Sequence, residues 1–272
     1  MSNASSMSNA SSMSNASSMS NASRPSGPSG PEPAIHVEHL HRRYGGTVAV
    51  DDVSLRVEPG EVVGILGTNG AGKTTTVEMI AGIRRPDRGR VRVLGLDPQR
   101  DRARLRQVLG VQLQEATLHA ALTVSELIGL YRTFYPDPRP AGELLELVGL
   151  EQHRGVRFEM LSGGQQQRLS IAIALVGRPR AVILDELTTG LDPRARRRMW
   201  TTVEHLRAEG VTILLVSHAM EEVERLCDRV VLLDGGRVVA TDTPAGLVTR
   251  TGAMTLDDAF VALTGKELEV AE

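Results

Sequence analysis

One stretch decides the fold of this chain: VVGILGTNGAGKTTT, residues 62–76. It opens with an apolar run of strand length, and the apolar residues after it, Val77, Ile80 and Ala81, recur at helical spacing. Between the two, residues 67–74 fit the P-loop pattern in full. The stretch therefore predicts a strand, a glycine-rich loop and a helix that together hold phosphate groups.

The P-loop pattern has a direct chemical meaning. Its glycines allow several backbone N–H groups to converge on phosphate oxygens, and the N-terminus of the following helix adds its positive dipole end. We expect Lys73 to reach the terminal phosphates and Thr74 to offer its hydroxyl to magnesium. Because the only other lysine is Lys266, a compact charge rather than a guanidinium is favoured at Lys73. A simple glycine-rich turn, the alternative, does not account for the full match.

The segments around the P-loop fall into blocks. Residues 1–33, a six-residue repeat followed by a proline- and glycine-rich run, are expected to be a disordered leader or an artefact of expression. Apolar runs of strand character lie at 35–37, 53–57, 91–93, 181–184, 211–216, 230–233 and 238–240. The pattern from 122 to 176 is helical, with Thr123 and Glu126 as a capping box, and a last helix is expected at 256–263. The helices are thus concentrated between two blocks of strands, which predicts an α/β fold.

Two further sites follow from strand ends and helix starts. Asp185 and Glu186 directly follow a buried strand, where a parallel sheet presents its carboxyl ends to a ligand. His218 follows another strand at the same kind of edge. Ser162 and Gln165 form a capping box around two glycines, so a second helix N-terminus is able to accept an anion.

With these motifs in view, the chain resembles the ABC ATPases. The SGGQ run at 162–165 matches the signature of that family, and the similarity extends from about residue 35 to about residue 248 with the motifs in the family's order. The resemblance implies an α/β fold with a P-loop NTPase (RecA-like) core, an antiparallel β subdomain and an inserted α-helical subdomain. It places the ATPase domain at 34–248, the helical subdomain at about 115–180 and a C-terminal helical extension at 249–272.

The resemblance also implies roles for single residues. The residues that contact ATP would be Tyr44, which stacks on adenine, and Gly67, Thr68, Asn69, Gly70, Ala71, Gly72, Lys73, Thr74 and Thr75. The catalytic residues would be Lys73, Glu186, which orients the attacking water, and His218, which contacts the γ-phosphate. Those at the magnesium ion would be Thr74, Gln114 and Asp185.

Two copies of the chain would act together. The resemblance implies that they face head to tail, so that the signature residues Ser162, Gly163, Gly164 and Gln165 contact the nucleotide held by the other copy. Asp192 would lie in the loop that crosses the dimer. The chain departs from the family's usual prolines at Thr68, Leu113 and Leu187, which bears on loop rigidity and leaves every functional group in place.

Composition restricts the partners. No run approaches the roughly 18 apolar residues that span a bilayer, so we expect a separate transmembrane permease and a location at the cytoplasmic face of the membrane. The net charge of -2 provides no overall basic field, so the arginines at 194 and 196–198 are interpreted as a solvated helix face and no nucleic acid is expected. His36, His39 and His41 are interpreted as solvated, and the single cysteine, Cys227, as a core residue of a reduced protein.

The tail suggests the kind of transporter. Residues 255–265 and the segment between Gln114 and Ser162 are similar to bacterial exporters of the drug-resistance class, the daunorubicin-resistance type among them, which favours export of drugs, lipids or other amphipathic compounds. The alternative is a soluble ABC ATPase acting in translation or DNA repair. Those relatives usually carry two cassettes, zinc-binding insertions or coiled coils, whereas this chain has one P-loop, one cysteine and no sustained heptads.

Overall fold

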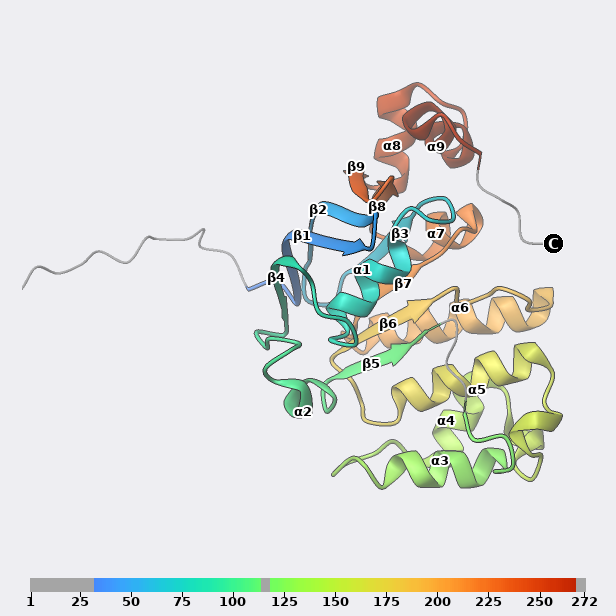
Figure 1. The fold of residues 1–272 in the computed structure, drawn as a ribbon. Helices are drawn as coiled ribbons and strands as arrows, with labels where there is room; N and C mark the ends of the chain where they lie inside the picture. The colour runs from blue at the N-terminus through green and yellow to red at the C-terminus, as the bar shows by residue number, and fades with distance from the viewer. Residues whose placement is uncertain (1–31, 114–117, 268–272) are drawn as a thin grey trace, which may run out of the picture. The chain divides into compact units, whose positions relative to one another are not determined.

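Two sheets form the centre of the molecule in this computed structural model, which describes residues 32–113 and 118–267 (Figure 1). The larger sheet has the order β5-β6-β7-β3-β8-β9, formed by Leu109–Gln112, Ala181–Asp185, Thr212–Val216, Val62–Leu66, Arg229–Asp234 and Arg237–Asp242. Its first five strands run parallel, and β9 is antiparallel to β8. The smaller sheet is antiparallel, with the order β2-β1-β4, formed by Thr47–Val57, Ile35–Tyr44 and Arg88–Val93. Every predicted strand is present, and β5 was not predicted.

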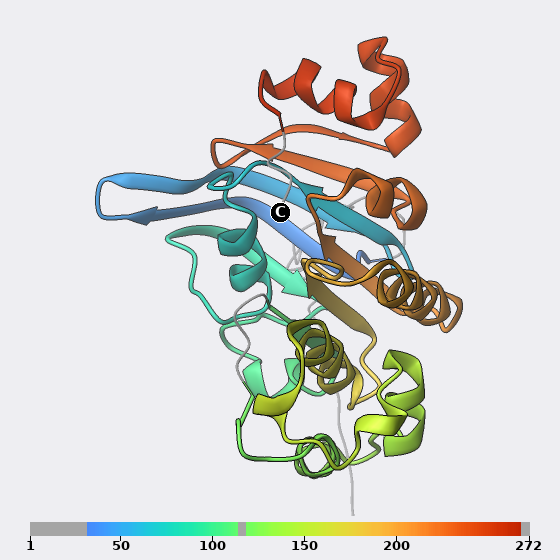
Figure 2. The same ribbon diagram turned by 90° about the vertical axis from the view of Figure 1, so that its right-hand side faces the viewer.

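Helices cover both faces of the larger sheet. They are α1 (Lys73–Ile80), α2 (Arg102–Leu105), α3 (Val124–Arg132), α4 (Ala141–Val148), α5 (Gly163–Leu175), α6 (Pro193–Ala208), α7 (Met220–Leu226), α8 (Pro244–Thr251) and α9 (Leu256–Thr264). The capping box of Thr123 and Glu126 opens α3 as predicted. Helix α5 packs against β5 and β6, and α3 and α4 pack on α5 beyond the β5 edge of the sheet. Helices α8 and α9 lie beside β9 at the opposite edge (Figures 1 and 2). This arrangement confirms the predicted α/β class, whereas the exact boundaries of the subdomains stay a prediction.

The alternation of strand side chains creates two apolar cores. In β3, Val63 and Ile65 join the core that contains α1 and the smaller sheet. Val62 and Leu66 point to the other face and join the core that contains α5, α6 and α7. Because a central parallel strand is covered on both faces, it is apolar at nearly every position, which explains the run that precedes the P-loop.

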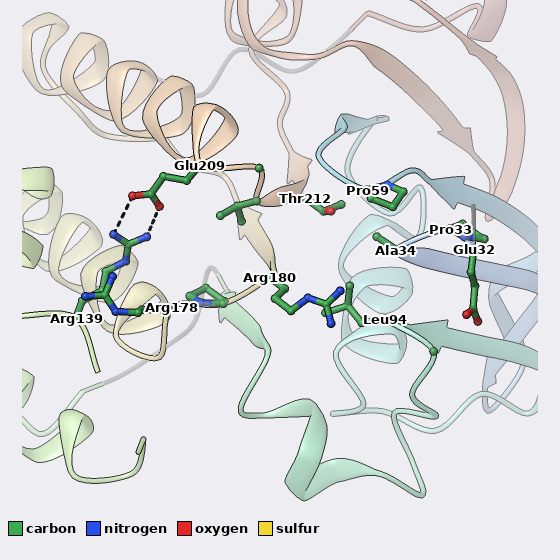
Figure 3. A pocket seen from close by; sticks show the side chains of 14 residues that line it. Glu32, Pro33, Ala34, Pro59, Leu94, Arg139, Arg178, Arg180, Glu209 and Thr212 are labelled. Carbon is green, nitrogen blue, oxygen red and sulfur yellow. Dashed lines mark hydrogen bonds and ion pairs between the residues drawn. The ribbon is translucent and has the colours of Figure 1, made fainter. Parts of the chain in front are cut away.

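An ion-pair cluster ties the helical segment to the core at the amino ends of β6 and β7. Arg139 precedes α4, is 3% exposed, and donates hydrogen bonds to Glu143 and to both carboxylate oxygens of Glu209, which follows α6. The Arg139 and Glu209 side chains face each other at the border of a pocket of about 510 Å³ (Figure 3). The proline-rich segment 136–140, which separates α3 from α4, thus carries a buried contact to the end of α6.

We expect Arg139→Ala to lower the free energy of unfolding by about 2–3 kcal/mol. Breaking a buried pair costs about 3–5 kcal/mol, and the partial exposure of both glutamates reduces that cost. Arg139 lowers the pKa of Glu209, so the pair's contribution is present at neutral pH and is lost as the pH falls through the folded-state pKa. Urea titrations at neutral and acid pH measure the effect, and the deficit should shrink in acid.

Arg100→Ala is the matched control for that prediction. Arg100 lies 4.0 Å from Asp97 as an exposed ion pair, so its loss should leave the urea midpoint almost unchanged. An equal loss of stability in both variants would contradict the structural importance of the Arg139 cluster.

Candidate functional site

The P-loop connects the carboxyl end of β3 to the start of α1. Strand β3 is buried at all five positions between β7 and β8, which fixes where the loop begins. The loop ends at Gly72, the N-cap of α1, and Lys73 is the first residue of that helix. The predicted strand, loop and helix are therefore present, and the backbone N–H groups of the first turn of α1 face the loop region.

Two loop positions admit no side chain. A Cβ on Gly67 would lie 2.4 Å from the carbonyl oxygen of Leu233, and a Cβ on Gly72 would lie 2.4 Å from that of Ala49. Gly72 also has a φ of +95°, which L-residues rarely adopt. The glycines thus let the loop lie directly against β8 and β2, which leaves its own amides as the lining of a cradle.

The Lys73 side chain closes back over this loop. Its Nζ donates hydrogen bonds to the carbonyl oxygens of Gly67 and Thr68 at 2.8 and 3.0 Å, and the residue is 8% exposed. An ammonium group held at the mouth of a loop of amides places a positive charge where a phosphate would be bound. A guanidinium is larger and planar, so arginine would not reproduce these contacts.

A pocket of about 390 Å³ joins the loop to other predicted site residues. Its lining residues are Tyr44, Thr47, Val48, Ala49, Asn69, Gly70, Gly72, Lys73, Thr74, Thr75 and Glu186. Segments from the β1–β2 hairpin, the P-loop and the end of β6 therefore meet at one cavity. Among the predicted ATP contacts, Gly67, Thr68 and Ala71 belong to the same loop without lining the pocket.

The carboxyl end of β6 places an acid at the edge of the sheet. Asp185 is the last residue of β6 and is 1% exposed. Its backbone N–H donates to Oε1 of Gln112 on the neighbouring strand β5, at 3.1 Å. Gln112 is itself 1% exposed, and sequence analysis missed it, although a polar residue at the end of an apolar strand is a usable signal. The predicted metal ligand Gln114 lies outside the described residues.

Glu186 adopts an unusual backbone conformation next to this acid. Its φ is +53°, a region that favours glycine, so the surrounding contacts must hold it there. Its N–H donates to the carbonyl oxygen of Val216 at 2.8 Å, and its own carbonyl accepts from Nε2 of Gln167 at 3.0 Å. The Glu186 carboxylate lies 3.7 Å from Nδ1 of His218. Strands β6 and β7 and helix α5 thus bring together the two residues that sequence analysis placed at separate strand ends.

The signature residues form a second cluster away from this pocket. Ser162 caps α5, and the capping box with Gln165 is present as predicted. A Cβ on Gly164 would lie 2.8 Å from Cδ2 of Leu191, so the start of α5 contacts the segment that precedes Asp192. None of Ser162, Gly163, Gly164, Gln165 or Asp192 lines the pocket that contains Lys73.

Asp192 has a defined structural task in this cluster. Its Oδ1 accepts hydrogen bonds from the backbone N–H groups of Arg194 and Ala195 and so caps α6. The bond from Ala195, followed by that from Arg194, lowers the pKa of the Asp192 carboxyl. The capping carboxylate stays charged at neutral pH and lies exposed at the helix N-terminus.

A buried acid behind His218 was also missed. Glu222 on α7 is 1% exposed, accepts from Nε1 of Trp200 at 3.3 Å, and has its pKa raised by burial. In the sequence it lies among Met220, Val223 and Leu226, whose apolar helical spacing predicts core packing, and nothing there marks an acid as buried.

The histidines of β1 lie at the surface and pair with carboxylates. His39 is solvated as predicted, with its side chain 78% exposed and 2.6 Å from Asp52, whereas the His41 side chain is 25% exposed and lies 3.2 Å from Asp51 across the β1–β2 hairpin.

Cys227 lies in the core as predicted. It is 8% exposed, burial raises the pKa of its thiol, and a Cβ on Gly64 would lie 2.9 Å from its sulfur. The thiol therefore packs against the central strand β3 and is unsuited to nucleophilic chemistry.

Comparison with known proteins assigns the family. The family model described as "ABC transporter" matches residues 50–189, which contain the P-loop, the signature residues and Glu186. This chain belongs to the ABC transporter family. It is the ATP-binding subunit of that family, with the cassette fold and an ATPase activity.

This ABC subunit is similar to two curated exporter ATPases and to a solved structure of a dimeric cassette. The Nod factor export ATP-binding protein I of Ralstonia nicotianae is 41% identical over 228 residues, which cover 81% of this chain and 70% of the relative. The linearmycin resistance ATP-binding protein LnrL of Bacillus subtilis is 36% identical over 227 residues, covering 82% and 73%. A dimeric ATP-binding cassette in a post-hydrolysis state, bound to ADP and Pi, is 25% identical with a TM-score of 0.71, covering 77% and 98%. The similarity to exporter ATPases disfavours the alternative role in translation or DNA repair.

The site fits a magnesium-bound nucleotide in the chemistry of its donors. In the ranges 32–113 and 118–267, His, Cys, Asp and Glu side chains form no group of three that could hold a metal. Magnesium on a nucleotide needs no such group, since it takes phosphate oxygens, waters and one or two protein ligands. The Thr74 hydroxyl and the buried Asp185 carboxylate supply that kind of donor.

No helix within the described part of this ABC subunit has the length and apolar character to cross a membrane.

Proposed function

We propose that this ABC subunit binds MgATP at the pocket of Lys73 and hydrolyses it to power export through a separate permease. The observation that supports the site is one cavity lined by the P-loop amides, the Lys73 ammonium, the Thr74 hydroxyl and the Glu186 carboxylate. Phosphoryl transfer to water requires positioning and neutralisation of charge, and these groups supply both.

Each group has a separate task in this proposal. Lys73 and the loop amides hold the β- and γ-phosphates, and the aromatic ring of Tyr44 at the pocket wall stacks on adenine. Thr74 and Asp185 hold the magnesium ion, which supplies charge neutralisation when bound. Glu186 orients and polarises the attacking water. His218, whose Nδ1 lies 3.7 Å from Oε1 of Glu186, contacts the γ-phosphate.

The cluster of Ser162 to Gln165 completes the site from a second copy. It lies at a helix N-terminus able to bind phosphate but outside the pocket of its own chain, so a nucleotide held by one copy would be capped by the other. The copies would close head to tail on ATP, and hydrolysis would release them. That cycle supplies a rigid-body motion for an attached membrane domain.

Export at the cytoplasmic face of the membrane is the direction we propose, with a drug, lipid or other amphipathic compound as cargo. The support is the pair of relatives named for Nod factor export and for linearmycin resistance. The permeation path belongs to the permease, so cargo identity requires its partner.

Affinity capture of the full chain from solubilised membranes tests this proposal. We expect an integral membrane protein with several spans to copurify, and inside-out vesicles containing the pair to accumulate an amphipathic dye only with MgATP. Vesicles with Glu186→Gln serve as the inactive control. Copurification of ribosomes without a membrane protein would instead support the translation-linked alternative.

A further inference from the structure

Two arginines converge on the aromatic ring at the pocket wall. The guanidinium carbons of Arg42 and Arg84 lie 4.9 and 5.2 Å from the centre of the Tyr44 ring. Both distances are within the range of a cation–π interaction. Tyr44 is 36% exposed, so without such contacts its ring would be free to change rotamer at the surface.

Each arginine is in turn held by a carboxylate. Glu78 on α1 accepts a bidentate pair of hydrogen bonds from Arg84, at 2.5 Å from Nε and 3.2 Å from Nη2. These bonds raise the pKa of Arg84, so it stays charged throughout the physiological range. Arg42 donates to Asp87 at 2.6 Å, and Asp87 also accepts from the backbone N–H of Arg43 at 2.8 Å.

The contacts form a continuous connection from the base side of the pocket to its phosphate side. Helix α1 begins at Lys73 and carries Glu78 in its second turn. Glu78 fixes Arg84, and Arg84 lies over Tyr44. A shift of α1 would therefore be transmitted to the ring, and the ring would be held in place by the helix that also presents the phosphate-binding amides.

A common surface cation–π contact is the simplest alternative explanation. Such pairs are frequent and usually weak when exposed. This arrangement differs because two cations share one ring, because each guanidinium is oriented by its own carboxylate, and because the ring lines the nucleotide pocket. A planar guanidinium locked by a bidentate carboxylate is able to orient an aromatic plane, whereas a flexible ammonium is not.

We propose that Arg84, locked by Glu78 and assisted by Arg42, is a positioning residue that fixes the Tyr44 ring for stacking and so sets the base-dependent part of ATP affinity. The inference rests on the proposed placement of adenine on Tyr44. It assigns Arg84 no contact with phosphate. The opposite hypothesis is that the arginines compete with the base for the ring, and it predicts that Arg84→Ala strengthens ATP binding.

Nucleotide titrations on the full chain separate these possibilities. Arg84→Ala should weaken ATP binding about three- to tenfold, because an unfixed ring must be immobilised on binding. The affinity for inorganic tripolyphosphate, which has no base, should stay unchanged. Steady-state assays should show a raised KM with an unchanged kcat. Glu78→Gln should give a smaller loss of the same kind, and Arg84→Lys should restore little of it.

Arg85→Ala is the matched control. It removes the same charge from the neighbouring residue, which lines a different groove and has no ion pair among the described contacts of the chain. Its ATP affinity should equal that of the wild type. The double-mutant cycle with Tyr44→Ala is the sharpest readout, because Arg84→Ala should have almost no further effect once the ring is gone.

The outcomes that overturn the inference are distinct from those that overturn the site. Unchanged or tighter ATP binding by Arg84→Ala, equal losses for ATP and tripolyphosphate, or a full Arg84 effect in the Tyr44→Ala background would each reject the positioning role. If Tyr44→Ala itself leaves ATP affinity unchanged, the base does not lie on Tyr44, and that part of the proposed function fails as well.

Discussion

Glu186→Gln will lower the rate of ATP hydrolysis by about 100- to 10,000-fold while ATP binding is retained. The substitution keeps the shape of the side chain and removes the charge to which we assign polarisation of the attacking water. The left-handed backbone at Glu186 is held by its N–H, which donates to the Val216 carbonyl, and by its carbonyl, which accepts from the Gln167 side chain. Because neither bond uses the Glu186 carboxylate, the loop should keep its conformation. Phosphate release under saturating MgATP measures the rate.

The same variant should accumulate as an ATP-bound dimer, since binding proceeds and release does not. Size-exclusion chromatography with and without MgATP measures this shift. Glu221→Gln is the matched control, because Glu221 is exposed on α7 and pairs only loosely with Arg196 at 3.9 Å. If Glu186→Gln hydrolysed ATP at the wild-type rate, Glu186 would not be the group that activates the water, and the neighbouring His218 would be the next candidate.

Lys73→Ala will weaken ATP binding by about 100-fold. Hydrogen bonds from a charged group contribute about 1.5–3 kcal/mol each, and a loss of about 3 kcal/mol corresponds to that factor. The carbonyl oxygens of Gly67 and Thr68 already hold the ammonium at the loop. We therefore expect only a small cost of reorganising the Lys73 side chain when ATP binds. A titration with a fluorescent ATP analogue measures the affinity.

The chain contains its own control for this experiment. Lys266, the only other lysine, pairs with Asp234 at 2.5 Å after the last helix. Lys266→Ala removes the same charge and should leave the affinity unchanged. Equal affinities of Lys73→Ala and the wild type would contradict phosphate binding by Lys73.

The two clusters of site residues explain why a single chain is expected to hydrolyse ATP poorly alone. Lys73, Thr74 and Glu186 share one pocket, whereas Ser162 and Asp192 belong to the cluster at the starts of α5 and α6. The dimeric ADP-bound cassette to which this chain is similar shows that cassettes of this fold pair. The separation of the clusters is therefore expected for a site shared between copies.

The P-loop and the strands around it could be predicted because the forces that form them are local. Residues 67–74 are adjacent in the sequence, and glycine at positions such as Gly72 is required by the backbone itself. Capping boxes at Thr123 and Ser162 link residues only three apart, so their pattern is visible before folding. Strand β5 and the role of Gln112 escaped prediction because a four-residue strand carries too little periodicity.

The sequence by itself determined the family, the phosphate-binding loop and the two acids at the carboxyl end of β6. Only the tertiary structure decided that His218 meets Glu186, that Gln112 binds the backbone of Asp185, and that Arg84 lies over Tyr44. These contacts join residues from 32 to 73 positions apart. The first two depend on a sheet whose order, β5-β6-β7-β3-β8-β9, is not the order of the chain, and the third depends on the packing of α1 against the smaller sheet. Local backbone preferences specify each element, whereas burial of apolar faces against one another selects which elements become neighbours.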